Sequence, residues 1–426
     1  MAVEIINRWE DIYMKLNQFG ETVRLGVLGL GNRGYSQLKV LLDMPDVEIT
    51  AVSDVYADRV ERAQKAVQDA RGKKPFGTCV AAECMDRADV DAVIIMTGWE
   101  THIPLAIQAM RLGKRPALEV GGATNLEECW QLVRTSEETG IPVMLLENCC
   151  YGEKELTLQN MIHQGVFGTL VHCAGAYSHD LRDEVGNGEI NRHYRQAHFL
   201  HRNGELYPTH ELGPIANYLN INRGNRMLSL TSMASKACGM HEWLEKHRPD
   251  SPLARAAFNE GDIVTTMIKC AGGETILLTH DCTLPRPYSR GGVIRGTKGM
   301  WMEDGRSIYL EGLTPVEPGD WAHHPEPDKK YMEQYRHPLW REYREFGVRG
   351  NHDGMDYLVL RAFIESVQNQ SEPPIDVYDA ASWLSITCLT EASIATGSAP
   401  VAIPDFTTGR WCLPRKNPAR AAFDLD

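Results

Sequence analysis

The feature that most constrains the fold is a glycine-rich turn between an apolar run and an amphipathic segment. Residues 23–30, VRLGVLGL, are continuously apolar, which is typical of a strand covered on both faces. Gly29, Gly31 and Gly34 follow with GxGxxG spacing, and the next segment, YSQLKVLLDM, has helical periodicity. We expect Gly29 to permit the tight turn, Gly31 to admit a pyrophosphate and Gly34 to let helix and strand pack closely.

A second apolar run ends in an acidic residue at a fixed distance from the glycine-rich turn. Residues 47–54, VEITAVSD, end in Asp54, which lies 20 positions beyond Gly34. A carboxylate at this distance accepts hydrogen bonds from the adenosine ribose hydroxyls, and its charge repels a 2′-phosphate. Strand, turn, helix and acid together predict a site for NAD rather than NADP. The alternative is a glycine-rich turn that binds nothing.

Three more apolar runs, at 90–98, 115–122 and 141–150, alternate with helical patterns. This alternation predicts an α/β fold with a Rossmann-type, doubly wound parallel sheet. Ligands bind at the carboxyl ends of the strands in such sheets. For each residue there, loop chemistry or helix capping is the alternative, and it is strongest for His102. The predicted cofactor-facing residues are Gly29, Gly31, Asn32, Arg33, Gly34, Asp54, Trp99, Glu100, Thr101, His102, Glu119, Val120, Glu147 and Asn148.

The periodicity changes after residue 150. Residues 262–282 contain two β-rich runs around AGGE, which indicates a hairpin, and strand-like segments continue to residue 310. We therefore predict a dinucleotide domain over 1–150, including an N-terminal extension over 1–22, and a sheet-rich α+β substrate domain over 151–426 that ends in a tail. The segment 311–352 is rich in proline, histidine and charge, and we interpret it as an excursion or lid.

A polar stretch in the second half is enriched in histidine and polar aromatic residues. A sugar pocket needs fixed donors, acceptors and aromatic faces, which favours a carbohydrate site over a plain polar loop. We find no HExxH motif and no Cys/His set with ligand spacing, so we expect no metal. The enriched residues are Tyr177, His179, His193, Tyr194, Arg195, His198, His201, Arg202, Tyr207 and His210.

Composition excludes several classes of protein. The formal net charge of −13 argues against nucleic-acid partners and against anionic membranes. Apolar runs such as 92–96 are far too short to cross a bilayer. The first 20 residues lack a basic and then apolar signal pattern, so we expect a cytoplasmic protein, or an exported one whose signal has been removed. The eleven scattered cysteines indicate reduced thiols rather than a disulfide framework.

The N-terminal order resembles the glucose–fructose oxidoreductase and inositol dehydrogenase superfamily. Its members join a dinucleotide domain to a second domain with a large open-faced, mostly antiparallel sheet. Their usual Glu-Lys-Pro mark is replaced here by Glu119 and Val120 in LEVGG, and their later Asp and His by Glu211 and Ile215. These departures make an NAD-dependent sugar dehydrogenase with net hydride transfer the alternative function, and a non-catalytic sugar or dinucleotide sensor a further one.

A narrower resemblance spans residues 23–412. The segments GAYSHDLR, RNGELYPTHELGP, GMDY and IPDFTTGRW resemble glycoside hydrolase family 109, which contains NAD-dependent α-N-acetylgalactosaminidases. The resemblance implies release of terminal α-linked N-acetylgalactosamine from glycans by oxidation, elimination, hydration and reduction, with tightly bound NAD recycled. The open sheet face of the wider superfamily often pairs, and by that analogy we expect a homodimer. Residues 183–200 and 311–350 resemble the family least.

The same resemblance points to a substrate site. It implies sugar-binding roles for Tyr177, Arg195, Tyr207, Pro208, Thr209, His210 and Tyr288, and catalytic roles for His210, Tyr177, His179 and Tyr207. We predict that His210 takes the proton of the C3 hydroxyl, because histidine titrates near neutrality. Tyr177 or His179 would take the C2 proton, and Tyr177 only if a neighbouring cation lowers its pKa.

Overall fold

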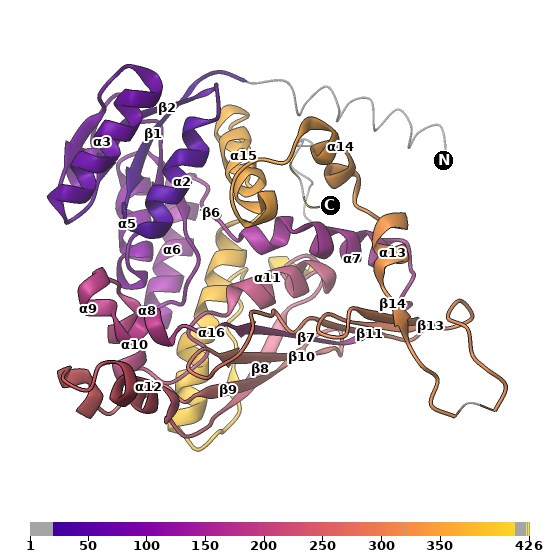
Figure 1. Ribbon diagram of the computed structural model, residues 1–426. Helices are drawn as coiled ribbons and strands as arrows, with labels where there is room; N and C mark the ends of the chain where they lie inside the picture. Colours follow the sequence, from indigo (N-terminus) through magenta and orange to yellow (C-terminus); the bar gives the residue numbers. More distant parts are fainter. Residues whose placement is uncertain (1–19, 320, 414–422, 424, 426) are drawn as a thin grey trace.

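The structure, a computed structural model, describes residues 20–319, 321–413, 423 and 425 (Figure 1). Most of the expected N-terminal extension, the region searched for a signal, and much of the C-terminal tail lie outside the described residues. All eleven cysteines are free thiols, as the sequence predicted. None of the helices in the described ranges has the length and apolar character needed to span a bilayer.

The first half forms a six-stranded sheet in the order β3-β2-β1-β4-β5-β6, with every pairing parallel. This confirms the predicted Rossmann-type doubly wound sheet. The helices of this half pack around the sheet (Figure 1). The strands are β1 (Val23–Leu28), β2 (Val47–Ser53), β3 (Phe76–Thr78), β4 (Ala92–Ile95), β5 (Arg115–Leu118) and β6 (Met144–Leu145), and the helices are α2 (Asn32–Leu42), α3 (Ala57–Arg71), α4 (Ala81–Met85), α5 (Trp99–Arg111) and α6 (Leu126–Thr139).

Two details differ from the sequence-based expectation. Strand β3 is an edge strand of three residues with no fully buried side chain, so it carries no apolar pattern that a sequence could reveal. Strand β6 covers only two of the ten residues in the predicted run. The chain turns there into the 3-10 helix η1 (Asn148–Tyr151), because the side chain of Glu147 accepts a hydrogen bond from the Cys149 amide and caps it.

The second half contributes a nine-stranded sheet in the order β14-β13-β12-β11-β7-β10-β9-β8-β15. Only β7 and β10 pair in parallel, so the predicted mostly antiparallel sheet is confirmed. The strands are β7 (Leu170–Ser178), β8 (Met227–Ala234), β9 (Ile263–Cys270), β10 (Thr275–Asp281), β11 (Val293–Gly296), β12 (Gly299–Met302), β13 (Ser307–Leu310), β14 (Glu326–Pro327) and β15 (Val401–Ala402).

Helices α11 (Thr209–Tyr218) and α16 (Val377–Ala395) pack on one face of this sheet, with α7 (Glu153–His163) beside them (Figure 1). The other face is open, and Thr265, Met267 and Lys269 alternate along β9 as exposed residues. The polar stretch before α11 is helical rather than extended, forming α8 (Arg182–Gly186), α9 (Gly188–Asn191) and α10 (Arg195–His201), and α12 (Gly239–His247) follows β8. The excursion at 311–352 contains α13 (Lys329–Gln334) and α14 (Pro338–Phe346).

The end of the chain returns to the first sheet. Helix α15 (Met355–Gln368) packs against α2, and α16 packs against α6. The buried ion pair between Arg361 and Asp46, at 2.7 Å, fixes α15 to the loop before β2. These contacts bring residues near 350–356 to the carboxyl edge of the parallel sheet, beside the glycine-rich turn.

Candidate active site

The glycine-rich turn has the shape that a dinucleotide requires. Gly29 has a φ of +87°, and a Cβ there would overlap the Met96 carbonyl. A Cβ on Gly34 would overlap the carbonyl oxygen of Gly29, so the helix can approach the strand only without a side chain. Helix α2 begins after Gly31, and no described side chain caps its first turn. Its free amide N–H groups therefore suit a phosphate.

Asp54 is fixed at the end of β2. Its Oδ2 accepts a hydrogen bond from the Leu30 amide at 2.7 Å, and its Oδ1 accepts one from the Tyr56 amide at 3.0 Å. Each oxygen keeps a lone pair for a ribose hydroxyl. The Arg59 guanidinium lies 3.6 Å from Oδ2, so a positive charge accompanies the acid.

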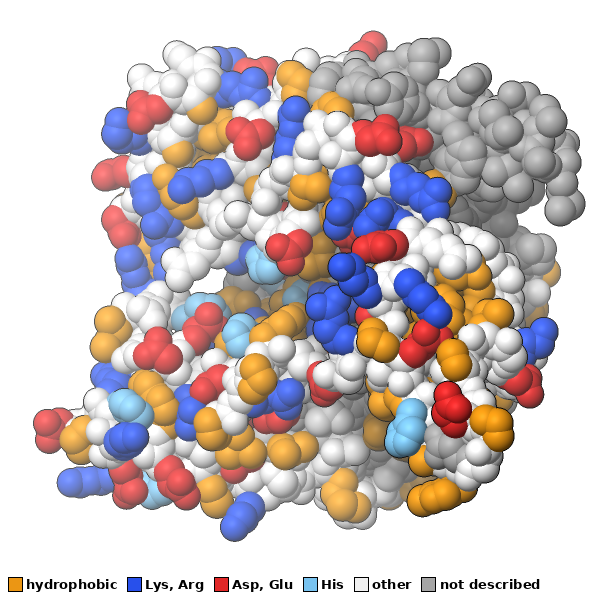
Figure 2. Space-filling view, turned by 45° about the vertical axis from the view of Figure 1, so that its right-hand side comes forward, with side chains coloured by type: hydrophobic (Ala, Val, Ile, Leu, Met, Phe, Trp, Pro, Cys, Tyr) orange, Lys and Arg blue, Asp and Glu red, His pale blue; other side chains and the backbone are white. Residues whose placement is uncertain are grey.

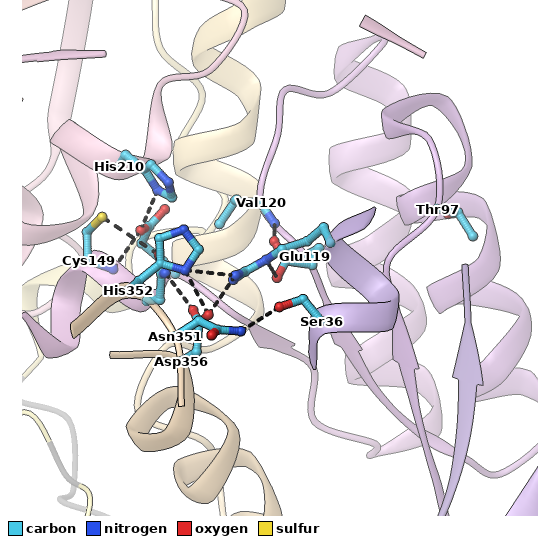
Figure 3. Close-up of polar contacts among 12 residues, drawn as sticks. Ser36, Thr97, Glu119, Val120, Cys149, His210, Asn351, His352 and Asp356 are labelled. Atoms are coloured by element: carbon cyan, nitrogen blue, oxygen red, sulfur yellow. Dashed lines mark hydrogen bonds and ion pairs between the residues drawn. The ribbon is translucent and has the colours of Figure 1, made fainter. Parts of the chain in front are cut away.

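Arg33 joins the first half of the chain to the second. It does so where Glu119, His352 and Asp356 come together (Figure 3). Its guanidinium contacts Glu119 at 2.7 Å and Asp356 at 2.8 Å. Asp356 Oδ1 accepts a hydrogen bond from the Asn148 side-chain amide at 2.8 Å. His352 Nδ1 lies 2.8 Å from Asp356 Oδ2, the oxygen that Arg33 contacts. Burial opposes ionisation of Asp356, but His352 and Arg33 outweigh it and hold the pKa well below its usual range.

Asp356 and His352 were not predicted as site residues. Asp356 belongs to the segment GMDY, yet no local pattern shows that a residue on α15 reaches a turn more than 300 positions earlier. His352 and Asp353 both have positive φ, at 51° and 53°. Such left-handed backbone in non-glycine residues is often held at functional sites, and it is a tertiary signal that the sequence does not carry.

Glu147 and His210 form a buried pair. Glu147 Oε1 lies 2.8 Å from His210 Nδ1, and the Glu147 side chain is fully buried. Burial disfavours the carboxylate, but the charge and hydrogen bond of His210 outweigh this and lower the pKa of Glu147. Glu147 Oε2 has no partner among the described residues. The structure thus connects Glu147, predicted as cofactor-facing, directly to the predicted base.

Cys149 lies beside this pair, and its Sγ, a Glu147 oxygen and a His210 nitrogen are within 4.8 Å of one another. Such a group resembles a metal-ligand set. However, the Arg290 guanidinium is 3.1 Å from Cys149 Sγ and 2.5 Å from Glu155. Burial also raises the pKa of the Cys149 thiol, although Arg290 opposes this. A metal ion bound here would meet the existing positive charge of Arg290, which disfavours a metal at this group.

An aromatic cluster packs against His210. The ring of Tyr207 lies 4.4 Å from that of Tyr177, 5.7 Å from Trp99 and 4.8 Å from His210, between centroids. The Arg195 guanidinium is 4.8 Å from the Tyr207 ring centre and 5.4 Å from that of Trp99. Residues predicted for the sugar and residues predicted for the cofactor therefore meet in one cluster. Histidine side chains gather around a hollow in this part of the surface (Figure 2).

The Tyr177 hydroxyl lies between two polar groups. Arg195 Nη1 donates to it at 3.4 Å, and His179 Nδ1 lies 3.3 Å away. Burial raises the pKa of Tyr177 more than Arg195 lowers it, so the cation alone does not make this phenol an easy base. Burial and the nearby Arg195 charge lower the pKa of His179, which favours its neutral imidazole. Tyr288 is half-exposed, with its ring centre 5.2 Å from that of His179.

Pro208 and Thr209 begin helix α11 and place His210 in its first turn. Both are buried, and the Thr209 hydroxyl has no hydrogen-bond partner among the described residues. Val120 donates its amide to Glu119 Oε2 at 3.1 Å, which fixes the carboxylate that binds Arg33.

The turn at 99–102 begins α5, and its residues differ in their surroundings. Trp99 packs against Tyr194 and His198, at 5.1 and 4.9 Å between ring centroids, and its indole N–H has no described partner. Glu100 contacts His198 at 3.3 Å. Thr101 donates to Thr97 Oγ1 at 2.7 Å, and the buried His102 ring contacts the Thr97 carbonyl at 3.0 Å. Thr101 and His102 therefore make local contacts of the kind expected if these residues cap the helix, which was the alternative to a cofactor-facing role.

Comparison with known proteins gives the family. A family model described as "Glycosyl hydrolase 109, C-terminal domain" matches residues 151–413, and one described as "Oxidoreductase family, NAD-binding Rossmann fold" matches residues 23–146. The chain belongs to glycosyl hydrolase family 109. The resemblance seen in the sequence is confirmed, and the first half of this family 109 chain is an NAD-binding Rossmann domain.

Relatives of this family 109 chain match along nearly its whole length. A glycosyl hydrolase family 109 protein from Stenotrophomonas maltophilia is 41% identical, over 92% of this chain and 90% of the relative. An α-N-acetylgalactosaminidase from Tannerella forsythia is 39% identical, over 91% and 87%. Among solved structures, a levoglucosan dehydrogenase in complex with NADH has a TM-score of 0.67 at 17% identity, covering 90% of this chain and 100% of its own. This last likeness shows the shared fold alone.

Proposed function

We propose that this family 109 chain is an NAD-dependent α-N-acetylgalactosaminidase that removes terminal α-linked N-acetylgalactosamine from glycans. The observation that carries the proposal is the buried Glu147–His210 pair, which lies against the Tyr177–Tyr207 cluster at the edge of the dinucleotide sheet. Relatives named α-N-acetylgalactosaminidase in Tannerella forsythia and Shewanella oneidensis are both 39% identical to this chain and support the same activity.

The fit of the turn and the acid to a dinucleotide supports NAD as the cofactor. The amides that open α2 would hold its phosphates and Asp54 its adenosine ribose, while Arg33, Glu119 and Asn148 line the other end. When bound, NAD⁺ supplies a hydride acceptor for C3 of the sugar and returns the hydride when the cycle closes. We include tight binding and recycling in the proposal, so that net chemistry is hydrolysis.

His210 is the first base in this proposal. Ionised Glu147 can only accept a hydrogen bond, so His210 Nδ1 carries the hydrogen and Nε2 keeps a free lone pair. Nε2 then takes the proton of the C3 hydroxyl as C3 is oxidised to a ketone, and Glu147 stabilises the imidazolium that forms. The proton returns to the C3 oxygen when C3 is reduced.

Tyr177, His179 and Arg195 supply the second proton transfer. The C3 ketone makes the C2 hydrogen acidic, and its loss breaks the bond between C1 and the aglycone oxygen. The Tyr177 oxygen takes the C2 proton as its own hydrogen moves to His179, and the hydrogen bond from Arg195 holds the phenol oxygen in place. Water then adds to C1, the proton that it loses goes to the released aglycone oxygen, and the same pair returns a proton to C2. Tyr207 and Tyr288 supply aromatic faces for the sugar.

The test is release of nitrophenol from p-nitrophenyl α-N-acetylgalactosaminide in deuterium oxide, followed by analysis of the freed sugar. We expect release, deuterium at C2 and no build-up of NADH. Release without deuterium at C2 would mean direct displacement and would remove the roles of Tyr177 and His179. Accumulation of NADH on a free sugar would establish the dehydrogenase instead.

A homodimer is the remaining part of the proposal. The open face of the nine-stranded sheet exposes Met233, at 64%, and Met267, at 44%. Exposed methionines on a broad sheet face are suited to burial against a second copy. Light scattering of the purified protein measures the mass directly, and a monomer at micromolar concentration contradicts this part alone.

A further inference from the structure

A short segment from the second half of the chain reaches across to the first half at the start of helix α3. Residues 188–192, comprising α9 and Arg192, form this segment, which we call the strap. The Arg192 guanidinium makes a two-pronged ion pair with Asp58, with Nη1–Oδ1 at 2.9 Å and Nη2–Oδ2 at 2.7 Å. Paired contacts of this kind fix orientation as well as distance.

Two further sets of contacts join the strap to the first half of the chain. Arg59 Nη2 donates to the carbonyl oxygens of Asn191, at 3.2 Å, and Arg192, at 3.4 Å. The Tyr56 ring contacts two guanidinium groups, that of Arg59 at 4.7 Å and that of Arg192 at 4.4 Å from the ring centre. The strap is thus tied by an ion pair, by main-chain acceptors and by cation–π contacts.

These contacts lie beside the residues predicted to hold the adenosine ribose and the phosphates of the cofactor. Tyr56, Asp58 and Arg59 directly follow Asp54, the predicted ribose ligand. Arg59 Nη1 is 3.6 Å from Asp54 Oδ2, and it lies 3.5 Å from the point where a Cβ on Gly31 would stand. The side chain that the strap holds in place therefore borders both the ribose ligand and the phosphate turn.

The strap continues into the sugar site. Arg192 has a φ of +54°, a left-handed turn after which the chain runs to Tyr194 and Arg195. The Tyr194 ring packs on Trp99, and Arg195 donates to the Tyr177 hydroxyl. One continuous segment thus borders the adenosine end of the groove and contributes the arginine of the sugar pocket.

We propose that residues 188–192 close the adenosine end of the cofactor groove, with Arg59 as a further cofactor-binding residue, and so retain the dinucleotide between turnovers. The proposal rests on the proposed use of NAD. A recycled cofactor must stay bound through each cycle, which a wall over the groove achieves by slowing dissociation. The ion pair is partly exposed, at 38% for Arg192 and 64% for Asp58, so it can open for initial loading and is weakened by salt.

The experiment measures the dissociation rate of NADH by its fluorescence, with excess NAD⁺ added as a chase. The variants are Asp58→Asn, Arg192→Gln and the swap Asp58→Arg with Arg192→Asp. The matched control is Lys65→Gln, which breaks the exposed Lys65–Asp69 pair farther along α3. Melting temperatures check that each variant folds.

We expect each single variant to release NADH about two- to fivefold faster, the range that loss of an exposed ion pair supports. The swap should bring the rate back toward that of the unmodified protein, which a merely structural defect would not do. We also expect release to quicken with rising salt in the unmodified protein and less so in Arg192→Gln. Single variants that release NADH as slowly as Lys65→Gln would overturn the proposal.

This result is independent of the glycosidase assay. A protein that binds NADH but releases no nitrophenol would overturn the proposed function and leave the strap measurement intact. Failure of the purified protein to bind NADH at all would overturn the strap together with the cofactor assignment.

Discussion

Replacing Glu147 by glutamine tests the proposed proton chemistry most directly. The carboxylate accepts a hydrogen bond from His210 Nδ1 at 2.8 Å and is fully buried. Losing a buried charge-assisted hydrogen bond costs about 1.5–3 kcal/mol, which corresponds to about a tenfold to hundredfold lower rate. The amide of glutamine can also donate to Nδ1, which moves the ring hydrogen to Nε2 and removes the free base.

Loss of this hydrogen bond alone should lower kcat of Glu147→Gln about tenfold to hundredfold, and loss of the free base as well should deepen the fall toward the 10²–10⁴-fold that general base catalysis contributes. The assay is nitrophenol release from p-nitrophenyl α-N-acetylgalactosaminide, with bound NADH measured by fluorescence. NADH binding should persist, because Glu147 acts through His210.

Glu205 provides a matched control for the same substitution. It is equally buried in the same region, but burial raises its pKa to about 7, so near neutral pH it is only partly ionised, unlike Glu147. Among the described residues its Oε1 accepts a hydrogen bond from the Tyr207 amide, at 3.2 Å, which a glutamine oxygen can also do. We expect Glu205→Gln to keep kcat within about threefold. A Glu147→Gln protein that retains more than about a tenth of the original kcat would refute the pairing argument.

Three further predictions follow from the same geometry. Asp54→Ser should weaken NADH binding about tenfold and raise the affinity for NADPH relative to NADH, because Arg59, 3.6 Å from Asp54, is then free to contact a 2′-phosphate. Titration with each fluorescent cofactor measures the two affinities, and an unchanged ratio between them would contradict the prediction. Gly34→Ala should destabilise the fold by about 1–3 kcal/mol, because the added Cβ overlaps the Gly29 carbonyl. The added Cβ of Gly31→Ala meets no described atom closer than 3.5 Å, so this variant should lose NADH affinity without losing stability. Urea denaturation measures the stability of each variant, and NADH titration measures its affinity. Burial lowers the pKa of His102 to about 4, so as pH falls below about 6.5 the unfolded chain binds a proton at this histidine before the folded chain does. The free energy of unfolding should therefore drop by about 2 kcal/mol between pH 7.5 and 5. His102→Gln should show a smaller drop in urea denaturation, and an equal drop in both proteins would exclude His102 as its source.

The sequence predicted the parallel sheet because its evidence is local. Each buried strand is an apolar run, each crossover helix has its own period, and the GxGxxG spacing specifies a turn that only glycine can make. Helix α6 also begins at a local signal, because the Asn125 side chain accepts a hydrogen bond from the Glu128 amide three residues later. The hairpin of β9 and β10 carries its own turn signal for the same reason.

The sequence failed where local patterns are weak or absent. Strand β3 has no buried side chain, and β6 is cut short by a cap that one glutamate makes. The polar residues from 183 to 201 give no apolar run, yet they form three short helices, because their order comes from contacts such as Arg192–Asp58 rather than from their own period.

The candidate site divides in the same way. By itself the sequence determined which residues end each parallel strand, since chain direction and strand order place them on one edge, and it named Asp54, Glu119, Asn148 and His210. Only the tertiary structure decided that Glu147 pairs with His210, that Asp356 ties Arg33 to Asn148, and that residues 188–192 meet Asp58. Those pairings join residues separated by 63 to 323 positions, and no periodicity or spacing encodes them. They arise because two sheets and the returning helices α15 and α16 bury a common set of apolar faces and so fix the polar groups at their junction.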